Sequence, residues 1–232
     1  MLDVGENQLG GSIPKWIGES LPNLVILSLR SNSFDGHIPE ELCQLGSLQI
    51  LDLGDNKISG AIPKCFKNLT AMVTKPYDTD AVIDYFVDGE FIRSELLVMK
   101  GRVDEYSTTL SLVTTMDLSY NNLIGDIPKE LASLEGLQSL NLSGNSLKGK
   151  IPDHIGNMRL LESLDFSRNH FHGPIPVSFS NLNFLSHLNL SYNNLTGRIP
   201  SSTQLQSFEQ VLLQWAITYV ALAVTEDCSH EC

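Results

Sequence analysis

The stretch LQSLNLSGNSLKGKIP (137–152) carries the pattern from which the architecture of the chain is inferred. Two closely similar stretches are LQILDLGDNKISGAIP (48–63) and LSHLNLSYNNLTGRIP (185–200). Each begins with leucines at the spacing L-x-x-L-x-L, continues to an asparagine, and ends in glycine, a variable residue, isoleucine and proline. Self-similarity at a fixed period is typical of repeat proteins. We therefore expect a stack of similar coils.

The asparagine of this pattern occurs seven times. Successive asparagines are separated by 25, 24, 65, 24, 24 and 24 residues, and all seven units end in isoleucine–proline. They are Asn7, Asn32, Asn56, Asn121, Asn145, Asn169 and Asn193. One coil cannot bury its own apolar side, so its stability must come from stacking on neighbouring coils. At 232 residues the chain is long enough for one elongated array.

The residue types of each unit suggest distinct structural roles. Leu140 and Leu142 are expected to point inward from a short strand and to stack on their counterparts one coil away. The amide of Asn145 is expected to turn inward and pair with backbone groups, forming a ladder from coil to coil. Gly149 permits a close backbone approach, and Pro152 sets a rigid bend without needing a hydrogen-bond donor.

These units resemble the plant-specific leucine-rich repeat, L-x-x-L-x-L-x-x-N-x-L-x-G-x-I-P, over residues 1–208. The resemblance implies an α/β-type repeat solenoid that is curved and twisted. Its parallel sheet would line the concave face, and irregular or 3-10 structure would form the convex side.

The 65-residue step equals one repeat of 24 residues plus 41 extra residues. We therefore divide the chain into three repeats in 1–69 (the first partial), an insertion in 70–112, four repeats in 113–208 and a non-repeat tail in 209–232. Two apolar runs flank Asp88-Gly89, which is a good hairpin turn, so a folded insertion is favoured over a plain surface loop.

Composition and motifs exclude several classes of function. Fifteen Lys and Arg against 27 Asp and Glu leave a net charge of −12, whereas a nucleic-acid-binding protein presents a basic face. No nucleophile elbow or phosphate-binding loop occurs and the six histidines are scattered, so neither an enzyme nor a cofactor is expected. Cys228, His230 and Cys232 are ligand types for zinc, but one chain end without supporting residues does not predict a metal site.

The two ends of the chain show no targeting or membrane signal. The N-terminal MLDVGENQLGGSIP has no basic region, apolar run or cleavage site, so no secretory signal is expected. The apolar run 211–224 is too short to cross a bilayer. It is either a short amphipathic helix over the last coil or a capping region read in a shifted frame. The second reading rests on Trp215–Ala221. When the possible codons of this stretch are read from the last base of the Trp codon, they can encode Gly-Asn-Asn-Leu-Cys-Gly.

Two longer stretches sharpen the resemblance. Residues 41–72 look like the last repeats before the insertion of plant leucine-rich-repeat receptor-like proteins, and residues 100–128 look like the exit from it. The resemblance implies the extracellular part of a kinase-less receptor at the plasma membrane, acting in defence or development. Its partners would be a protein or peptide ligand and the ectodomain of a co-receptor kinase. Because a signal peptide and a membrane span are not seen in the sequence, the chain is expected to be a truncated form, either secreted or of undetermined location.

Three alternatives remain open. They are a secreted inhibitor resembling polygalacturonase-inhibiting proteins, part of a receptor-kinase ectodomain, and a fragment without function. The first family lacks an insertion, so residues 70–112 argue against it.

Cysteines and glycosylation signals favour the secretory route. Cys43 and Cys65 lie 22 residues apart on successive coils, close enough for a disulfide, although free thiols are the alternative. Four asparagines begin an Asn-x-Ser/Thr signal and are candidate glycan acceptors. They are Asn68, Asn141, Asn189 and Asn194.

The variable positions of the strands in 113–208 are expected to face the concave side and to bind a partner. The candidate partner-binding residues are Asp117, Tyr120, Glu162, Asp165, Arg168, His187 and Tyr192, with Ser139, Asn141 and Ser143 beside them. The two tyrosines are the expected anchors in an acidic and aromatic strip. The alternative is a solvated sheet that binds nothing.

Overall fold

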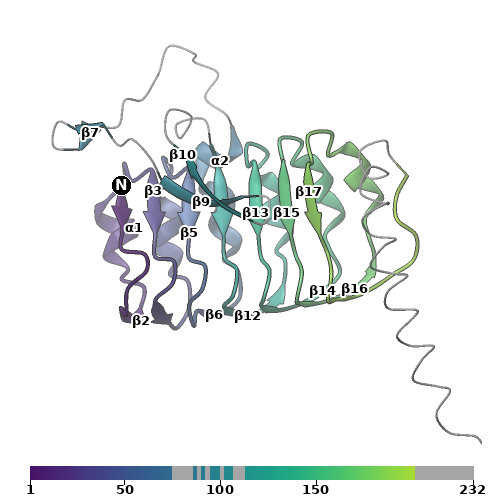
Figure 1. Ribbon diagram of the computed structural model, residues 1–232, viewed down its shortest axis with the longest axis horizontal. Coiled ribbons are helices and arrows are strands. Elements are labelled where there is room, and N and C mark those ends of the chain that lie inside the picture. Colours follow the sequence, from purple (N-terminus) through teal and green to yellow (C-terminus); the bar gives the residue numbers. More distant parts are fainter. Residues whose placement is uncertain (75–85, 88–89, 92–94, 100–101, 107–112, 202–232) are drawn as a thin grey trace, which may run out of the picture.

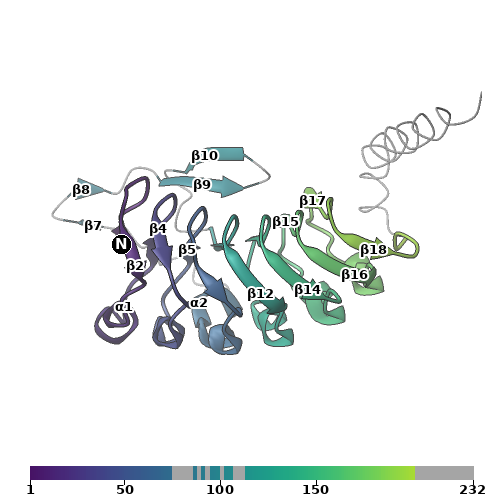
Figure 2. The ribbon, with the colours of Figure 1, turned by 90° about the horizontal axis from the view of Figure 1, so that it is seen from below.

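The computed structural model describes residues 1–74, 86–87, 90–91, 95–99, 102–106 and 113–201 (Figure 1). Its main feature is a seven-stranded parallel sheet with one strand from each repeat. In order, the strands are β1 (Leu2–Asp3), β3 (Ile26–Ser28), β5 (Ile50–Asp52), β11 (Thr115–Asp117), β13 (Ser139–Asn141), β15 (Ser163–Asp165) and β17 (His187–Asn189). The helices line the opposite side of the solenoid (Figure 2). The predicted architecture is confirmed.

The core is a column of stacked leucines, as the repeat pattern predicts. The middle residue of each central strand is fully buried, and in register Leu140 lies beside Leu164 while Met116 lies beside Leu51. Leu142 is also fully buried. Burial of a leucine side chain stabilises by about 1.5–3 kcal/mol, and here each one is buried only by its neighbouring coils.

The insertion does not interrupt the sheet. Strand β5 pairs directly with β11, with Ile50 opposite Thr115 and Asp52 opposite Asp117. Two antiparallel hairpins lie in the inserted sequence: β7 (Phe86–Val87) with β8 (Glu90–Phe91), and β9 (Glu95–Met99) with β10 (Arg102–Tyr106). The first pair flanks the predicted turn, whose residues 88 and 89 lie outside the described residues. The second hairpin was not predicted.

The first residues of the predicted insertion, which begins at residue 70, pack against the repeats. Helix α2 (Thr70–Val73) belongs to the repeats, because Met72 is fully buried and its carbonyl accepts a hydrogen bond from the Gly136 N–H at 2.9 Å. The Thr70 hydroxyl also donates to the Gly46 carbonyl. These contacts join helix α2 to the coils on both sides of the insertion.

A second parallel sheet, which was not predicted, runs along one flank (Figures 1 and 2). Its strands are β6 (Ser59–Gly60), β12 (Asn122–Asp126), β14 (Ser146–Gly149), β16 (His170–Pro174) and β18 (Asn194–Thr196). Strands β2 (Gly10–Ser12) and β4 (Ser33–Asp35) pair in the same way in the first two coils. The glycine of the repeat pattern lies within one of these strands, at its end or directly after it. Gly149, for example, has φ of 80°, where a side chain would be strained.

The convex side consists of short helices that begin directly after the proline of the pattern or, in α1, one residue later. They are α1 (Trp16–Ser20), η1 (Glu40–Gln44), η2 (Lys64–Asn68), η4 (Lys129–Ser133), η5 (Asp153–Asn157) and η6 (Val177–Asn181). The Pro39 carbonyl accepts the Leu42 N–H at 3.1 Å, and the Pro152 carbonyl accepts the Ile155 N–H in the same way. Proline suits this position because its fixed φ starts the turn and it needs no donor.

The asparagines form the expected ladder. Asn145 donates its amide to the Leu118 carbonyl of the preceding coil at 3.0 Å and to the Leu142 carbonyl of its own coil at 3.1 Å. Its Oδ1 accepts the Leu123 N–H of the preceding coil at 3.0 Å. The same contacts recur at Asn32, Asn56, Asn121, Asn169 and Asn193. Asn7, in the first coil, is exposed and donates only within its own coil.

The convex turns also hold the one disulfide of the described residues, which joins Cys43 of η1 to Cys65 of η2, with Cα atoms 5.7 Å apart. The position of Cys43 is one where adjacent coils approach closely. At the position of Cys43 in another coil, a Cβ added to Gly156 would lie 2.1 Å from the Ser178 carbonyl oxygen.

The predicted tail (209–232), with Cys228, His230 and Cys232, lies outside the described residues. Every helix in the described part of the chain is too short or too polar to cross a bilayer.

Candidate recognition surface

The last residue of each sheet strand belongs to one row of acidic and amide side chains. In register the row is Asp3, Ser28, Asp52, Asp117, Asn141, Asp165 and Asn189. Each Asp or Asn of the row uses its Oδ1 to accept the N–H two residues later, as Asp117 does from Ser119 at 2.8 Å. This local bond turns the chain out of the strand and fixes the side chain.

In two predicted binding residues, Asp117 and Asp165, the second carboxylate oxygen also accepts a hydrogen bond. Asn141 donates to Asp117 Oδ2 at 3.1 Å, and Asn189 donates to Asp165 Oδ2 at 3.1 Å. Asp117 is only 4% exposed. Because these carboxylates are held by neighbouring coils, we assign Asp117 and Asp165 a structural role in place of the expected partner contact.

Arg30 completes this row across the insertion. Its guanidinium donates to Asp52 at 2.7 Å and to Asp117 at 2.5 Å, so one side chain of the second coil joins the third coil to the first coil after the insertion. We call these three residues the Arg30 clamp. The guanidinium lies over Gly54, where an added Cβ would be 2.5 Å from Nη2. Sequence reasoning missed the clamp, because its partners are 22 and 87 residues away.

The clamp places charge in a buried site. Burial, followed by the nearby Asp117 charge, raises the pKa of Asp52 to about 6, against the opposing effect of Arg30. Burial disfavours the charged form of Arg30, but Asp117 and Asp52 outweigh it and the pKa of Arg30 is raised. The clamp therefore holds one cation firmly between two acidic groups.

Three other predicted residues face solvent. Tyr120 is 56% exposed, Tyr192 is 52% exposed, and Arg168 is exposed with its guanidinium 4.5 Å from the centroid of the Tyr192 ring. Each directly precedes a ladder asparagine, and Gly144 occupies the same place in the coil between Tyr120 and Arg168. We call these four residues the rim row.

The rim row is rigid. Its residues have φ between 49° and 66°. The N–H groups of Tyr120, Gly144 and Arg168 each donate to a carbonyl of the next coil, as Arg168 does to Ser191 at 2.9 Å. The Tyr192 carbonyl accepts the Asn169 N–H of the preceding coil at 3.2 Å. Gly144 matters because an added Cβ would lie 2.9 Å from the Tyr120 ring, so the ring rests directly on its backbone. Sequence reasoning found the tyrosines and Arg168 but not their shared left-handed conformation.

The remaining predicted residues are less accessible. Glu162 is half-buried and accepts a hydrogen bond from Gln138 at 3.2 Å. His187 is half-buried, and burial lowers its pKa against the opposing charge of Asp165. Ser139 and Ser143 are buried. The structure therefore brings the exposed candidates together only at the rim row.

The four candidate glycan acceptors fall into two groups. Asn68 on η2 and Asn194 on β18 are exposed. Asn141 and Asn189 are half-buried, and both donate to the acidic row as described above. A glycan on either of the last two would replace a hydrogen bond that joins two coils.

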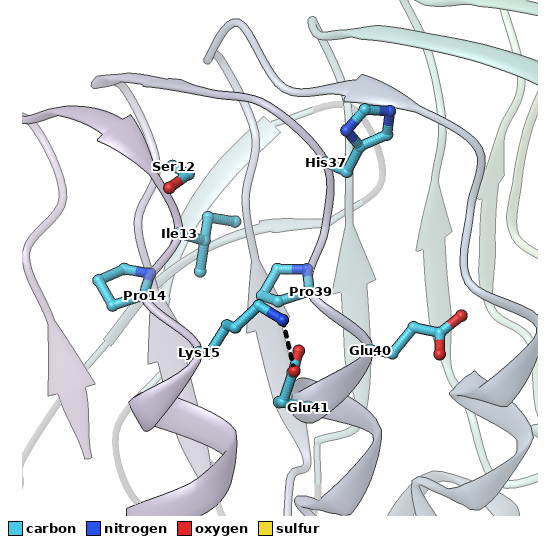
Figure 3. A pocket seen from close by; sticks show the side chains of 8 residues that line it. All are labelled: Ser12, Ile13, Pro14, Lys15, His37, Pro39, Glu40 and Glu41. Carbon is cyan, nitrogen blue, oxygen red and sulfur yellow. Dashed lines mark hydrogen bonds and ion pairs between the residues drawn. The ribbon is translucent and has the colours of Figure 1, made fainter.

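A hollow lies at the other end of the described chain, between α1 and η1 (Figure 3). It is lined by Ser12, Ile13, Pro14, Lys15, His37, Pro39, Glu40 and Glu41. Lys15 and Glu41 form an ion pair of 2.8 Å across it. Within the described residues no three metal-ligating side chains are grouped.

A family model described as Leucine Rich Repeat matches residues 23–45, 47–69, 112–134, 136–158, 160–182 and 184–205, which is more than half of the chain. Receptor-like protein EIX2 of Solanum lycopersicum is 51% identical over 145 residues, covering 60% of this chain and 14% of that protein. The chain thus spans about a seventh of this relative.

Solved structures agree with this likeness. The ectodomain of the Arabidopsis receptor kinase HAESA, in complex with an extended IDA peptide hormone, has a TM-score of 0.64 and 34% identity, covering 86% of this chain and 26% of that one. HAESA in complex with IDA and the co-receptor SERK1 has a TM-score of 0.53 and 32% identity, covering 85% and 30%. The chain therefore belongs to the leucine-rich repeat family, and it is the counterpart of part of the repeat region of a plant receptor-like protein.

Proposed function

We propose that the chain is an extracellular recognition segment that binds a protein or peptide ligand and the ectodomain of a partner kinase, in defence or developmental signalling. The observation that carries this proposal is the rim row. It is a rigid, solvent-facing row of two tyrosines and an arginine on a sheet whose Asp117 and Asp165 carboxylates are engaged within the protein.

The rim row has the chemistry of a binding hot spot. Tyrosine and arginine are enriched among residues that dominate protein interfaces, and side chains that are already ordered lose little entropy on binding. Arg168 is held over the Tyr192 ring, and Tyr120 rests on Gly144. With neighbouring coils about 4.8 Å apart, the row extends for roughly 15 Å. That length suits a peptide segment or one loop of a partner.

Two further observations support an extracellular setting. The Cys43–Cys65 disulfide is of a kind that persists in oxidising compartments, and Asn68 and Asn194 are exposed within glycosylation signals. The similar HAESA ectodomain is complexed with a peptide hormone and with SERK1. On that similarity we propose a co-receptor ectodomain of the same type as the partner. We further propose that the chain acts through binding and has no catalytic activity.

The test measures binding of the SERK1 ectodomain to the secreted chain by biolayer interferometry. The triple variant Tyr120→Ala, Arg168→Ala, Tyr192→Ala should weaken binding at least about tenfold, because hot-spot truncations each cost about 2 kcal/mol or more. The control is Phe184→Ala, which removes an aromatic that is 62% exposed but outside the row. Equal affinity of the parent and the triple variant would refute the role of the rim row, and absence of binding to the parent would refute this partner.

A further inference from the structure

Charge is distributed unevenly over the second parallel sheet (β6, β12, β14, β16 and β18), which we call the flank sheet. The chain carries a net charge of −12, yet the later coils present a group of cationic and imidazole side chains on this sheet. They are Lys148, Lys150, His170, His172 and Arg198, and all are exposed. We call them the lateral strip. It lies on β14 and β16 and directly after β18, which run side by side on a different face from the concave sheet (Figures 1 and 2).

The strip is compact. Lys148 is in register with His170 on the next strand, and His172 lies two residues further along the same strand. Adjacent strands are about 4.8 Å apart, and alternate residues of one strand lie on the same face about 7 Å apart. The Lys150 side chain extends over the next coil, where its Cγ is 3.4 Å from the Cβ position of Gly173. Four nitrogen-bearing side chains therefore meet within about one nanometre.

These cations are available for a ligand. The ion pairs found in the described ranges involve only Lys15 and Arg30, so the strip contributes to none of them. The acidic residue on the strands of this sheet is Asp126 of the neighbouring strand β12, which is in register with Lys148 and whose carboxylate lies 2.5 Å from the Cβ position of Gly149. A ligand with several negative charges would meet one acidic neighbour and five basic or imidazole groups.

The strip lacks the apolar centre of a protein interface. Most exposed residues between its cations are polar, as Ser146, Asn194 and Thr196 are, while Leu147 and Phe171 on the same strands are fully buried in the core. The exposed apolar neighbours are single and lie apart from each other, Ile124 on β12 and Pro174 on β16. Protein interfaces usually contain aromatic or aliphatic anchors at their centre. A hydrophilic chain of regularly spaced charges needs only cations and hydrogen-bond donors. The rim row, in contrast, supplies tyrosines and one cation.

We propose that the lateral strip binds a linear acidic polysaccharide through its carboxylates, independently of the rim row. The two lysines and Arg198 form ion pairs with the carboxylates of the polysaccharide. The imidazoles and Ser146 form hydrogen bonds with its hydroxyl groups. A nucleic acid is also a hydrophilic polyanion, but the strip offers no Phe, Tyr or Trp ring on which its bases would stack. An acidic polypeptide offers the same carboxylates but lacks the dense hydroxyl groups that this polar surface accommodates.

The test uses the intact secreted chain, immobilised, with polygalacturonate of defined length as the probe. Fully methyl-esterified polymer is the neutral control, and poly-L-glutamate and single-stranded DNA are the two competing polyanions. Binding is measured in about 50 mM and about 300 mM sodium chloride, because contacts between exposed charges weaken with salt. The variants are Lys148→Gln with Lys150→Gln in the strip, and Lys64→Gln with Lys129→Gln on η2 and η4. Both pairs are exposed and change the net charge equally.

We expect polygalacturonate to bind at low salt and the strip variant to weaken it roughly three- to tenfold, with no change in the convex variant. Asp126→Asn should strengthen it. The proposal is overturned if polygalacturonate does not bind, or if both lysine pairs have the same effect. It is also overturned if poly-L-glutamate or DNA binds as tightly, since the surface would then recognise charge alone. Circular dichroism of each variant excludes unfolding as the cause.

Discussion

Replacing Arg30 with methionine should destabilise the solenoid at the junction where the insertion leaves it. Methionine keeps most of the apolar stem but removes the cation between Asp52 and Asp117, each of which is only 4% exposed. Removing one partner of a buried ion pair leaves an uncompensated buried charge, which costs about 3–5 kcal/mol. We expect a loss of that size in the free energy of unfolding at pH 7.

The loss should depend on pH in a defined direction. The pKa of Asp52 is raised from 3.8 to about 6 in the folded chain, which corresponds to about 3 kcal/mol. A raised carboxyl pKa contributes stability that is fully present below about pH 4 and is lost as the pH rises through about 6. Without Arg30 the pKa rises further, because a cation that favoured the charged form is gone. The deficit of the variant should therefore shrink between pH 7 and pH 5.

Urea unfolding followed by circular dichroism at pH 7 and pH 5 measures this difference, since urea does not screen charges. The control is Lys15→Met, which removes the exposed ion pair to Glu41 and should have no measurable effect at either pH. If Arg30→Met unfolds at the same urea concentration as the parent at pH 7, the clamp does not join the two sets of repeats. A deficit that grows at pH 5 would show that the pH argument has the wrong sign.

Three other changes test the solenoid. Asn145→Ala leaves the buried Leu123 N–H without its partner and removes one of the two donors from each of three carbonyls, so it should cost about 1–3 kcal/mol in urea unfolding, whereas Asn7→Ala, in the exposed first coil, should cost far less; equal losses would contradict the ladder. Gly156→Ala places a Cβ against the backbone of the next coil and should lower stability by about 1–3 kcal/mol, so an unchanged melting temperature would argue against that close approach. Peptide mapping under non-reducing conditions should recover Cys43 linked to Cys65, and the double serine variant should lose about 2–4 kcal/mol; two alkylatable thiols in the secreted protein would disprove the disulfide.

The amino-acid sequence by itself determined the repeat architecture, the buried leucines and the asparagine ladder. This was possible because each coil is made of local contacts and its neighbour repeats the same pattern about 24 residues later. Leu140, Leu142 and Asn145 could be assigned their places from spacing alone. Strands β7 and β8 also pair on the two sides of the predicted turn, whose residues 88 and 89 lie outside the described residues.

Only the tertiary structure decided which variable positions remain free to bind. Asp117, Asp165 and Tyr120 look equally available in the sequence, since all lie on or directly after strands of the same sheet. Stacking brings Arg30, 87 residues away, onto Asp117, and it brings Asn189 onto Asp165, while Tyr120 stays exposed. Side-chain hydrogen bonds between coils depend on distances of a few tenths of an ångström, which a repeat pattern does not encode. The physical reason is that periodicity specifies the backbone stack, whereas each cross-coil contact depends on two particular side chains.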